Sequence, residues 1–264
     1  MLSLLIFIFC AAAAVSLGVT PIVRRLAPAL GLIDLPGHRK VHVTPTPRGG
    51  GIAIFLGVLV PALGLLVLGF SGAGRESEGL SLLFDSAGFD DHRGQQLIAI
   101  SVGAIILFFT GLADDRWNLS WKFRLGLQLA VAVGVAFAGV RATIFVGQPW
   151  VGFVATVLWI LVLTNALNFL DNMDGLSGGI GLIASTMFAI IMLTGTSEPH
   201  WFVAGFLLLL AGSLGGFLFH NWPPARIFMG DTGSCLVGLW IACMTVVGTF
   251  YDYGRTGTHV ILTP

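Results

Sequence analysis

The chain has 264 residues, of which 56% are hydrophobic and only 10% are charged. Soluble domains carry roughly one-quarter charged residues, so this composition excludes an ordinary soluble protein. The 13 basic and 13 acidic residues cancel, so net charge indicates no particular partner, and we expect no nucleic acid to bind.

Long uncharged runs in chain order predict membrane-crossing helices, because each is close to the roughly 20 residues that span the hydrocarbon core. Eight complete runs cover residues 2–23, 50–70, 95–113, 125–140, 150–168, 179–197, 201–219 and 235–250, and a ninth begins at His259. Arg24 and Arg25 follow the first run and no basic residue precedes it, the reverse of a signal peptide. We therefore expect a retained first span and an all-α polytopic transmembrane helix bundle, forming one domain over residues 1–264.

The polar stretches between these runs predict the topology. Residues 31–49, 114–124, 169–178 and 220–234 are each separated from the next by two runs, which puts all four on one face. The basic residues also fall on this face, except Arg75, Arg93, Arg141 and Arg255. By the positive-inside rule, we expect the four stretches to be cytoplasmic and the N-terminus to be outside. The loop over 71–94 reads as a solvated Gly- and Ser-rich linker.

A polar ridge ends the fifth run. Residues three apart are neighbours on a helix, so Asn165, Asn168, Asp171 and Asp174 would line one face before Gly175. Ionised carboxylates are costly at membrane depth and rarely lack a partner there. The ridge therefore predicts a cation or strong hydrogen-bond donors opposite it.

Two adjacent carboxylates, Asp114 and Asp115, end the third run. A helix C-terminus already carries partial negative charge, so this pair requires a cation. Lys122 and Arg124, at the start of the next run, could supply part of it, and Mg²⁺ could supply the rest. Adjacent residues point about 100° apart on a helix, so we expect the two carboxylates to have different roles.

The stretch before the eighth run contains Gly230, Asp231, Thr232, Gly233 and Ser234. Asp, Thr and Ser are common N-cap residues, so one interpretation is a well-capped membrane helix. The other is a phosphate site made by backbone amides, with Asp231 holding a metal against the phosphate. The sequence alone leaves both interpretations open.

A basic loop precedes the second run and contains Lys40, His42 and Arg48. Such a cluster suits phosphate recognition. Anionic lipid headgroups would be bound by the same chemistry.

Three motifs together resemble a known family across nearly the whole chain. They are Asp114-Asp115-x-x-Asn118, the ridge from Asn165 to Asp174-Gly-Leu, and Asn221-x-x-Pro-Ala-x-x-Phe-Met-Gly-Asp231-Thr-Gly-Ser. In order and spacing they resemble the polyprenyl-phosphate N-acetylhexosamine-1-phosphate transferases (glycosyltransferase family 4). The Asp34-x-Pro-x-x-Arg39-Lys40-x-His42 opening is similar to the WecA/TagO branch, which uses UDP-N-acetylglucosamine, rather than to the MraY branch. Asn172 departs from the usual Gly, and the family's later His-rich loop is missing, so we expect a chain truncated at its C-terminus.

The resemblance implies transfer of N-acetylglucosamine 1-phosphate from UDP-N-acetylglucosamine to undecaprenyl phosphate, releasing UMP, at the cytoplasmic face of a bacterial inner membrane. It implies catalytic roles for Asp114, which would orient or deprotonate the lipid phosphate, and for Asp115, which would face the metal and substrate. It implies Mg²⁺, with Mn²⁺ as a substitute, on Asn168 and Asp231. The expected substrate-binding residues are Asp171, Asp174, Gly175, Lys122, Arg124, Lys40, His42, Arg48 and Asn221.

The expected partners are the UDP-sugar, the polyprenyl phosphate, membrane lipids and a second copy of the chain in a homodimer. Three alternatives stay open: a UDP-N-acetylmuramoyl-pentapeptide transferase, an ion-coupled membrane transporter, and a structural membrane scaffold. A transporter should spread its polar residues near the midplane of several spans. A scaffold would not need the acidic residues at all.

Overall fold

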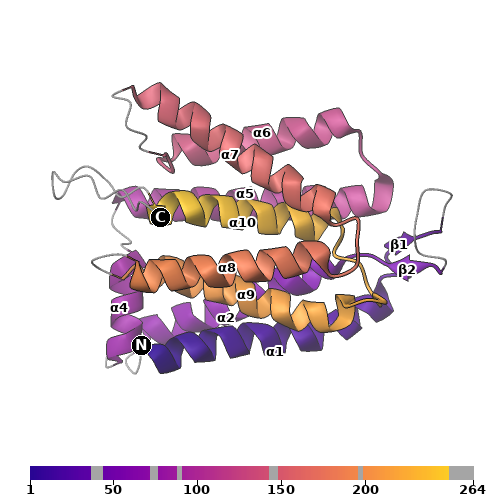
Figure 1. Cartoon of the computed structure of the whole chain (residues 1–264), viewed down its shortest axis with the longest axis horizontal. Coiled ribbons are helices and arrows are strands. Elements are labelled where there is room, and N and C mark those ends of the chain that lie inside the picture. Colours follow the sequence, from indigo (N-terminus) through magenta and orange to yellow (C-terminus); the bar gives the residue numbers. More distant parts are fainter. Residues whose placement is uncertain (37–43, 72–76, 88–90, 143–147, 196–198, 250–264) are drawn as a thin grey trace.

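The computed structural model is a bundle of long helices, as expected for an all-α polytopic membrane protein (Figure 1). It describes residues 1–36, 44–71, 77–87, 91–142, 148–195 and 199–249. The helices are α1 (Leu2–Leu26), α2 (Gly50–Phe70), α4 (Glu78–Ala87), α5 (Asp91–Trp117), α6 (Trp121–Phe137), α7 (Pro149–Leu170), α8 (Leu176–Thr194), α9 (Trp201–Asn221) and α10 (Gly230–Thr249). Strands β1 (Ile33–Asp34) and β2 (Thr46–Pro47) form a short antiparallel pair in which Asp34 lies opposite Thr46.

Each of the eight complete runs predicted from the sequence corresponds to a helix. Seven of the described helices are long and apolar enough to cross a membrane, and α6, with 17 residues, is at the short limit. Several helices begin before or end after the uncharged runs, because polar residues near a membrane surface can continue the helical hydrogen bonds. Helix α5 therefore includes Asp114 and Asp115 in its last turns. The ninth run, from His259, lies outside the described residues.

Helix α10 lies at the centre of the bundle. Most of its side chains are buried, and it packs against α2, α5, α7, α8 and α9 (Figure 1). The backbone of its first turn packs closely against two glycines, one on α2 and one on α5. A Cβ added at Gly51 would lie 2.3 Å from the Gly233 nitrogen, and one at Gly111 would lie 2.5 Å from Thr232 Cα. Such close approach requires glycine, so the start of α10 is fixed tightly between α2 and α5.

One expectation about the loops is wrong. Residues 71–94 were expected to be a solvated linker, but they contain α4, which lies across one end of the bundle (Figure 1). Its buried residues Leu80, Leu83 and Ala87 follow helical spacing and face α9 and α2. The Gly- and Ser-rich composition around it concealed this short amphipathic pattern.

Consecutive long helices run in opposite directions along the bundle, and its two ends carry different elements. The β1–β2 pair and the connections α5–α6, α7–α8 and α9–α10 lie together at one end, on the right of Figure 1. Helix α4, the N-terminus and the end of α10 lie at the other. The spacing argument correctly predicted that the four polar stretches share one end.

Candidate active site

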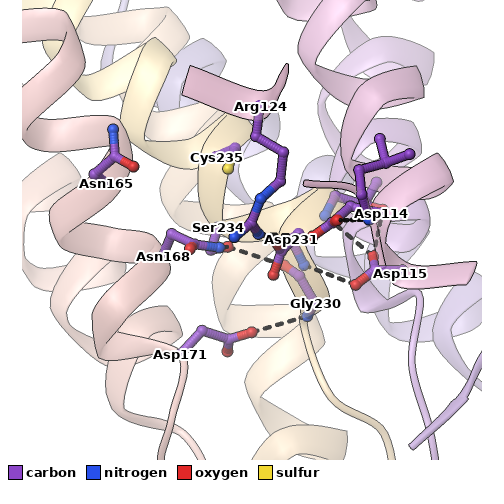
Figure 2. A network of polar contacts seen from close by, with 12 residues as sticks. Asp114, Asp115, Arg124, Asn165, Asn168, Asp171, Gly230, Asp231, Ser234 and Cys235 are labelled. Atoms are coloured by element: carbon purple, nitrogen blue, oxygen red, sulfur yellow. Dashed lines mark hydrogen bonds and ion pairs between the residues drawn. The ribbon is translucent and has the colours of Figure 1, made fainter. Parts of the chain in front are cut away.

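Two carboxylates close the N-terminus of α10. The N–H of Gly230 donates to Asp171 Oδ2 at 2.9 Å, and the N–H of Asp231 donates to Asp115 Oδ1 at 2.9 Å (Figure 2). Thr232 donates to Asp115 Oδ2 from its N–H at 3.1 Å and its hydroxyl at 2.6 Å. The first N–H groups of a helix have no partner within the helix and favour negative charge. Three of them are engaged by protein carboxylates here, which favours the capping interpretation over direct phosphate binding.

Gly230 is the residue that allows Asp115 to come so close. Its φ of +75° lies in the left-handed region. A Cβ at this position would stand 2.6 Å from either oxygen of Asp115. Glycine is therefore required by both the backbone conformation and the space.

Arg124 joins two acidic residues that are far apart in the sequence. Its Nη1 contacts Asp114 Oδ2 at 2.7 Å, and the same nitrogen is paired with Asp231 Oδ2. The other oxygen of Asp114 accepts the Leu119 N–H at 2.6 Å. Figure 2 shows Arg124 pointing into the space between Asn168 and Asp114. The structure thus places a cation against Asp114 of the predicted pair, whereas Asp115 accepts its hydrogen bonds from α10.

Lys122 takes no such position. Its side chain is exposed, and its Nζ lies 5.7 Å from the centre of the Trp121 ring. Both basic residues were predicted to serve this site. Only Arg124 reaches the carboxylates among the described contacts.

The amides of α7 face polar groups on α6 and α10. Asn168 Nδ2 donates to Ser234 Oγ at 3.0 Å, one turn along from Asp231. Asn165 Nδ2 donates to Gln128 Oε1 at 2.8 Å, and Gln128 Nε2 in turn lies 3.6 Å from Cys235 Sγ. Sequence reasoning missed the buried Gln128, whose only signal was a lone amide inside an apolar run.

The second half of the ridge is not helical. Helix α7 ends at Leu170, so Asp171 is its C-cap and Asp174 lies in the following turn. The prediction of a single helical ridge is therefore correct only for Asn165 and Asn168. From this C-cap position the Asp171 side chain accepts the N–H of Gly230.

Asp174, Gly175 and Asn221 connect two loops. Asp174 Oδ2 accepts the Ala225 N–H at 2.9 Å. Asn221, which is buried, accepts the Gly175 N–H at 3.0 Å and donates to the Ile227 carbonyl at 2.9 Å. In the structure these three residues join the α7–α8 and α9–α10 loops. That they contact a substrate stays a prediction.

The basic loop is attached to the same region. Arg48 Nη2 is paired with Asp34 Oδ1 at 2.6 Å, across the β1–β2 pair. The Phe228 N–H donates to the Pro47 carbonyl, and the Gly50 N–H donates to the Phe228 carbonyl, both at 2.9 Å. Arg48 is thus held beside the α9–α10 loop. Lys40 and His42 lie outside the described residues.

The surroundings of Asp171 disfavour its charged form. Burial raises the pKa of this carboxyl well above its usual range, and the Gly230 N–H and the Arg48 cation offset part of the shift. The charge of Asp171 therefore opposes folding, although its hydrogen bond to Gly230 supports it.

Asp231 and Asn168 could contribute oxygens to a divalent cation. The Asn168 amide nitrogen donates to Ser234, and its carbonyl oxygen is the atom able to act as a metal ligand. The Asp231 side chain is 24% exposed, compared with 9% for Asp114. No group of three His, Cys, Asp or Glu side chains that could hold a metal occurs among the described residues. This partial set of hard oxygen donors fits Mg²⁺, which commonly keeps several waters and binds substrate phosphates.

A family model and known proteins match this chain. The model for glycosyl transferase family 4 matches residues 97–249. A protein of Bacillus subtilis (strain 168), described as a probable undecaprenyl-phosphate N-acetylglucosaminyl 1-phosphate transferase, is 35% identical over 88% of this chain and 60% of its own length. The decaprenyl-phosphate N-acetylglucosaminephosphotransferase of Mycobacterium tuberculosis (strain H37Rv) is 36% identical over 92% of this chain and 61% of its own length.

The similarity extends to a related group of enzymes. The phospho-N-acetylmuramoyl-pentapeptide-transferase of Acetivibrio thermocellus is 32% identical over 79% of this chain and 62% of its own length. The chain thus spans about 60% of the length of these relatives. The matched region includes Asp114, Asp115, Asp171, Asp174 and Asp231 but not the Asp34–Arg48 pair.

Proposed function

Because the chain belongs to glycosyl transferase family 4, we propose that it transfers a sugar 1-phosphate from a nucleotide sugar to a polyprenyl phosphate. The proposed pair is UDP-N-acetylglucosamine and undecaprenyl phosphate, by similarity to the Bacillus relative. The observation that carries the proposal is the convergence of Asp114, Asp231 and Asn168 at one end of an apolar bundle. Such a site can meet a water-soluble nucleotide sugar while the bundle contacts a lipid tail.

The reaction is an exchange of phosphate bonds. An oxygen of the lipid phosphate forms a bond to the phosphorus that carries the sugar, while the bond from that phosphorus to the bridging oxygen breaks and UMP leaves. Phosphoryl transfer depends mostly on alignment and on charge neutralisation. The second pKa of a phosphate monoester is about 6, so the nucleophile is already largely ionised at neutral pH.

Asp114 suits alignment better than proton removal in this proposal. Both of its oxygens are engaged, one by Arg124 and one by the Leu119 N–H. With both oxygens committed to these two bonds, the carboxylate is held in one position. Its role would be to fix Arg124 beside the incoming phosphates.

Asp115 acts through α10 in this proposal. Its two oxygens accept three hydrogen bonds from Asp231 and Thr232. It would therefore orient the carboxylate of Asp231 by fixing the backbone that carries it. This differs from the sequence-based expectation, in which Asp115 itself faced the metal.

Asp231 and the carbonyl oxygen of Asn168 would hold the Mg²⁺. When bound, such an ion neutralises diphosphate charge and stabilises the leaving UMP. Mn²⁺, which also accepts carboxylate and carbonyl oxygens, would substitute for it.

The end of the bundle that carries the site is proposed to face the cytoplasm of a bacterial inner membrane. The supporting observation is the excess of Lys and Arg at this end. A homodimer is part of the same proposal, by analogy with other membrane enzymes that pack apolar helix faces.

The Acetivibrio relative supports a second candidate substrate, UDP-N-acetylmuramoyl-pentapeptide. The two substrates differ in the sugar substituent, while the carboxylate site would serve both. An ion-coupled transporter has less support, because Asp114, Asp115, Asp171 and Asp231 gather at one end of the helices and not near their middle.

One assay tests the function and separates the sugars. Membranes containing the chain are incubated with undecaprenyl phosphate and with radiolabelled UDP-N-acetylglucosamine or UDP-N-acetylmuramoyl-pentapeptide, and label in the lipid fraction is counted. We expect Mg²⁺-dependent label from UDP-N-acetylglucosamine, abolished in Asp231→Asn. Label from the muramoyl substrate alone would assign the second candidate. Equal label in wild type and Asp231→Asn would contradict the proposed site.

A further inference from the structure

Two adjoining cavities lie at the end of the bundle away from the carboxylates. The larger has a volume of about 250 Å³ and the smaller about 100 Å³. Ala87, Leu97, Ile100 and Phe202 line both of them. The cavities therefore lie side by side, below α4 and between the first halves of α5 and α9.

The larger cavity is suited to hydrocarbon. Its walls come from α1, α2, α4, α5, α9 and α10 and are apolar except for Ser101 and the indole nitrogen of Trp240. Trp240 is held by Phe206 and Phe55, whose ring centres lie 5.7 and 6.2 Å from its own. A buried water needs two to four polar partners, and these walls offer at most two. An alkyl chain needs none.

The smaller cavity has a different character. Its lining includes Arg93, Gln96, Arg141 and His200. Gln96 Nε2 donates to the Gly139 carbonyl at 3.1 Å, and Arg93 Nη1 donates to the Ser86 carbonyl at 3.1 Å. These bonds tie the start of α5 to α4 and to the segment after α6. The smaller cavity is therefore lined by hydrogen-bond donors and cations, and two of these side chains are held in place by the bonds just described.

Arg141 is oriented by its own contacts. Its Nε donates to the Ala136 carbonyl at 2.9 Å, and its guanidinium lies 5.5 Å from the centre of the Phe153 ring. A guanidinium has five N–H donors, so one backbone bond leaves others for an anion. Among the described residues, no carboxylate is paired with Arg141. Asp85 on α4 is exposed and lines neither cavity.

Arg93 and Arg141 lie on the side of the bundle that has few basic residues. Only four basic residues fall on this side of the predicted topology, and two of them, Arg93 and Arg141, line this one cavity. The other two, Arg75 and Arg255, lie outside the described residues. Two arginines therefore line one cavity on the side that is otherwise poor in basic residues, which gives this cavity a positive charge.

We propose that the two cavities bind one anionic phospholipid from the surrounding bilayer. Its phosphate would be bound by Arg93 and Arg141, and one acyl chain would occupy the larger cavity. The acceptor lipid of the proposed reaction is a poorer occupant, because its phosphate must reach Asp114 and Asp231 at the opposite end. The bound lipid would connect α4, α5 and α9, and so would stabilise the bundle.

The test measures binding without using transferase activity. The full chain is purified in a neutral detergent, and its unfolding midpoint is recorded with added phosphatidylglycerol or phosphatidylcholine of the same acyl chains. A ligand that binds only the folded state raises the midpoint, and we expect about 5 °C at a hundredfold excess over Kd. We expect this shift with phosphatidylglycerol, and native mass spectrometry should show one phosphatidylglycerol retained per chain. Equal shifts with both lipids would overturn the proposal.

Matched variants locate the site. In Arg93→Gln/Arg141→Gln the shift with phosphatidylglycerol should fall to that with phosphatidylcholine. Arg24→Gln/Arg25→Gln, with the same charge change on exposed residues of α1, should keep it. Ala62→Phe, which fills the larger cavity, should reduce lipid retention in the mass spectrum even if the arginine double variant does not fold. Retention unchanged by Ala62→Phe contradicts the chain-binding cavity. A larger shift with undecaprenyl phosphate that is lost in the arginine variant would assign the cavity to the acceptor lipid and overturn the phospholipid assignment.

Discussion

The carboxylate of Asp115 receives two hydrogen bonds from Thr232, one from the N–H at 3.1 Å and one from the hydroxyl at 2.6 Å. The two residues are 117 positions apart, and both are buried. The last turn of α5 and the first turn of α10 are therefore joined through side chain and backbone at once. The position of Asp231, between Gly230 and Thr232, follows from this contact.

Thr232→Val should separate the hydroxyl bond from the backbone bond. The variant keeps the shape and the N–H but leaves one oxygen of a buried carboxylate short of a donor, so we expect about 1–3 kcal/mol of lost stability. The transfer rate should fall as well, because Asp231 loses part of its support. Unfolding in detergent and lipid labelling in membranes measure the two effects. Thr232→Ser, which keeps the hydroxyl, is the control. A loss in Thr232→Ser with none in Thr232→Val would mean that the methyl group matters and the hydrogen bond does not.

Arg124→Gln should change metal affinity. The guanidinium now neutralises Asp114 and Asp231 together, so its removal leaves two carboxylates to attract a divalent cation. We expect Mn²⁺ to bind more tightly in the absence of substrate, on the order of tenfold or about 1.4 kcal/mol, while the transfer rate falls. Electron paramagnetic resonance of free Mn²⁺ measures the affinity. Lys122→Gln carries the same charge change two residues away and should leave it unaltered. Weaker Mn²⁺ binding in Arg124→Gln would show that the arginine supports the metal.

Asp171→Asn should flatten part of the dependence of stability on pH. The folded-state pKa of Asp171 is raised, so the folded state binds the proton more tightly, and stability falls as pH rises from about 4 through the folded pKa, by about 1.4 kcal/mol per unit of difference. The variant still accepts from the Gly230 N–H but does not titrate. Unfolding midpoints between pH 5 and 8, with chelator present, should show wild type losing stability relative to Asp171→Asn. Parallel curves would show that Asp171 has an ordinary pKa.

Asn221→Leu decides between a structural and a substrate-binding role. The side chain is buried and bonds to both the Gly175 N–H and the Ile227 carbonyl, so we expect a loss of about 2 kcal/mol or more in stability. A residue that only binds substrate would instead raise the KM and leave unfolding unchanged. Asn221→Asp, which keeps the acceptor for Gly175 but loses the donor to Ile227, should lie between wild type and Asn221→Leu.

Cysteine labelling tests which end of the bundle faces the cytoplasm. In a Cys10→Ala background, single cysteines at Asn118 and Trp222, at the carboxylate end, should react only from the cytoplasmic side. A cysteine at Gln148, at the start of α7, should react only from outside. Cys235 and Cys243 are buried and should contribute little background. Labelling of Asn118 from outside would reverse the proposed orientation.

Hydropathy was enough to predict the helices, because membrane spans must be long and apolar. It failed where short-range patterns were weak. Helix α4 carries only Leu80, Leu83 and Ala87 as a buried face. The end of α7 was predicted wrongly because polar residues spaced three apart fit a helix and also fit the turn that follows it.

The candidate residues of the site could be predicted, but apart from Arg124 their partners could not. Intramembrane acids and amides are rare, so Asp114, Asp171 and Asn168 were conspicuous in the sequence. That Asp115 would cap α10 depends on which helices surround α10, and no local pattern encodes this arrangement. Gln128 was overlooked because its importance comes only from facing Asn165 on another helix.

The central position of α10 also bears on how the protein is made. The ribosome synthesises the chain from its N-terminus, so α5 and α7 reach the membrane before α10 has been synthesised. During that interval Asp115 and Asp171 lack the amides that they accept in the finished bundle, and their charges must be hydrated at the membrane surface. Insertion of α10 between the glycine faces of α2 and α5 then ends this exposure. Insertion of α10 therefore supplies the hydrogen-bond donors of both carboxylates in one event.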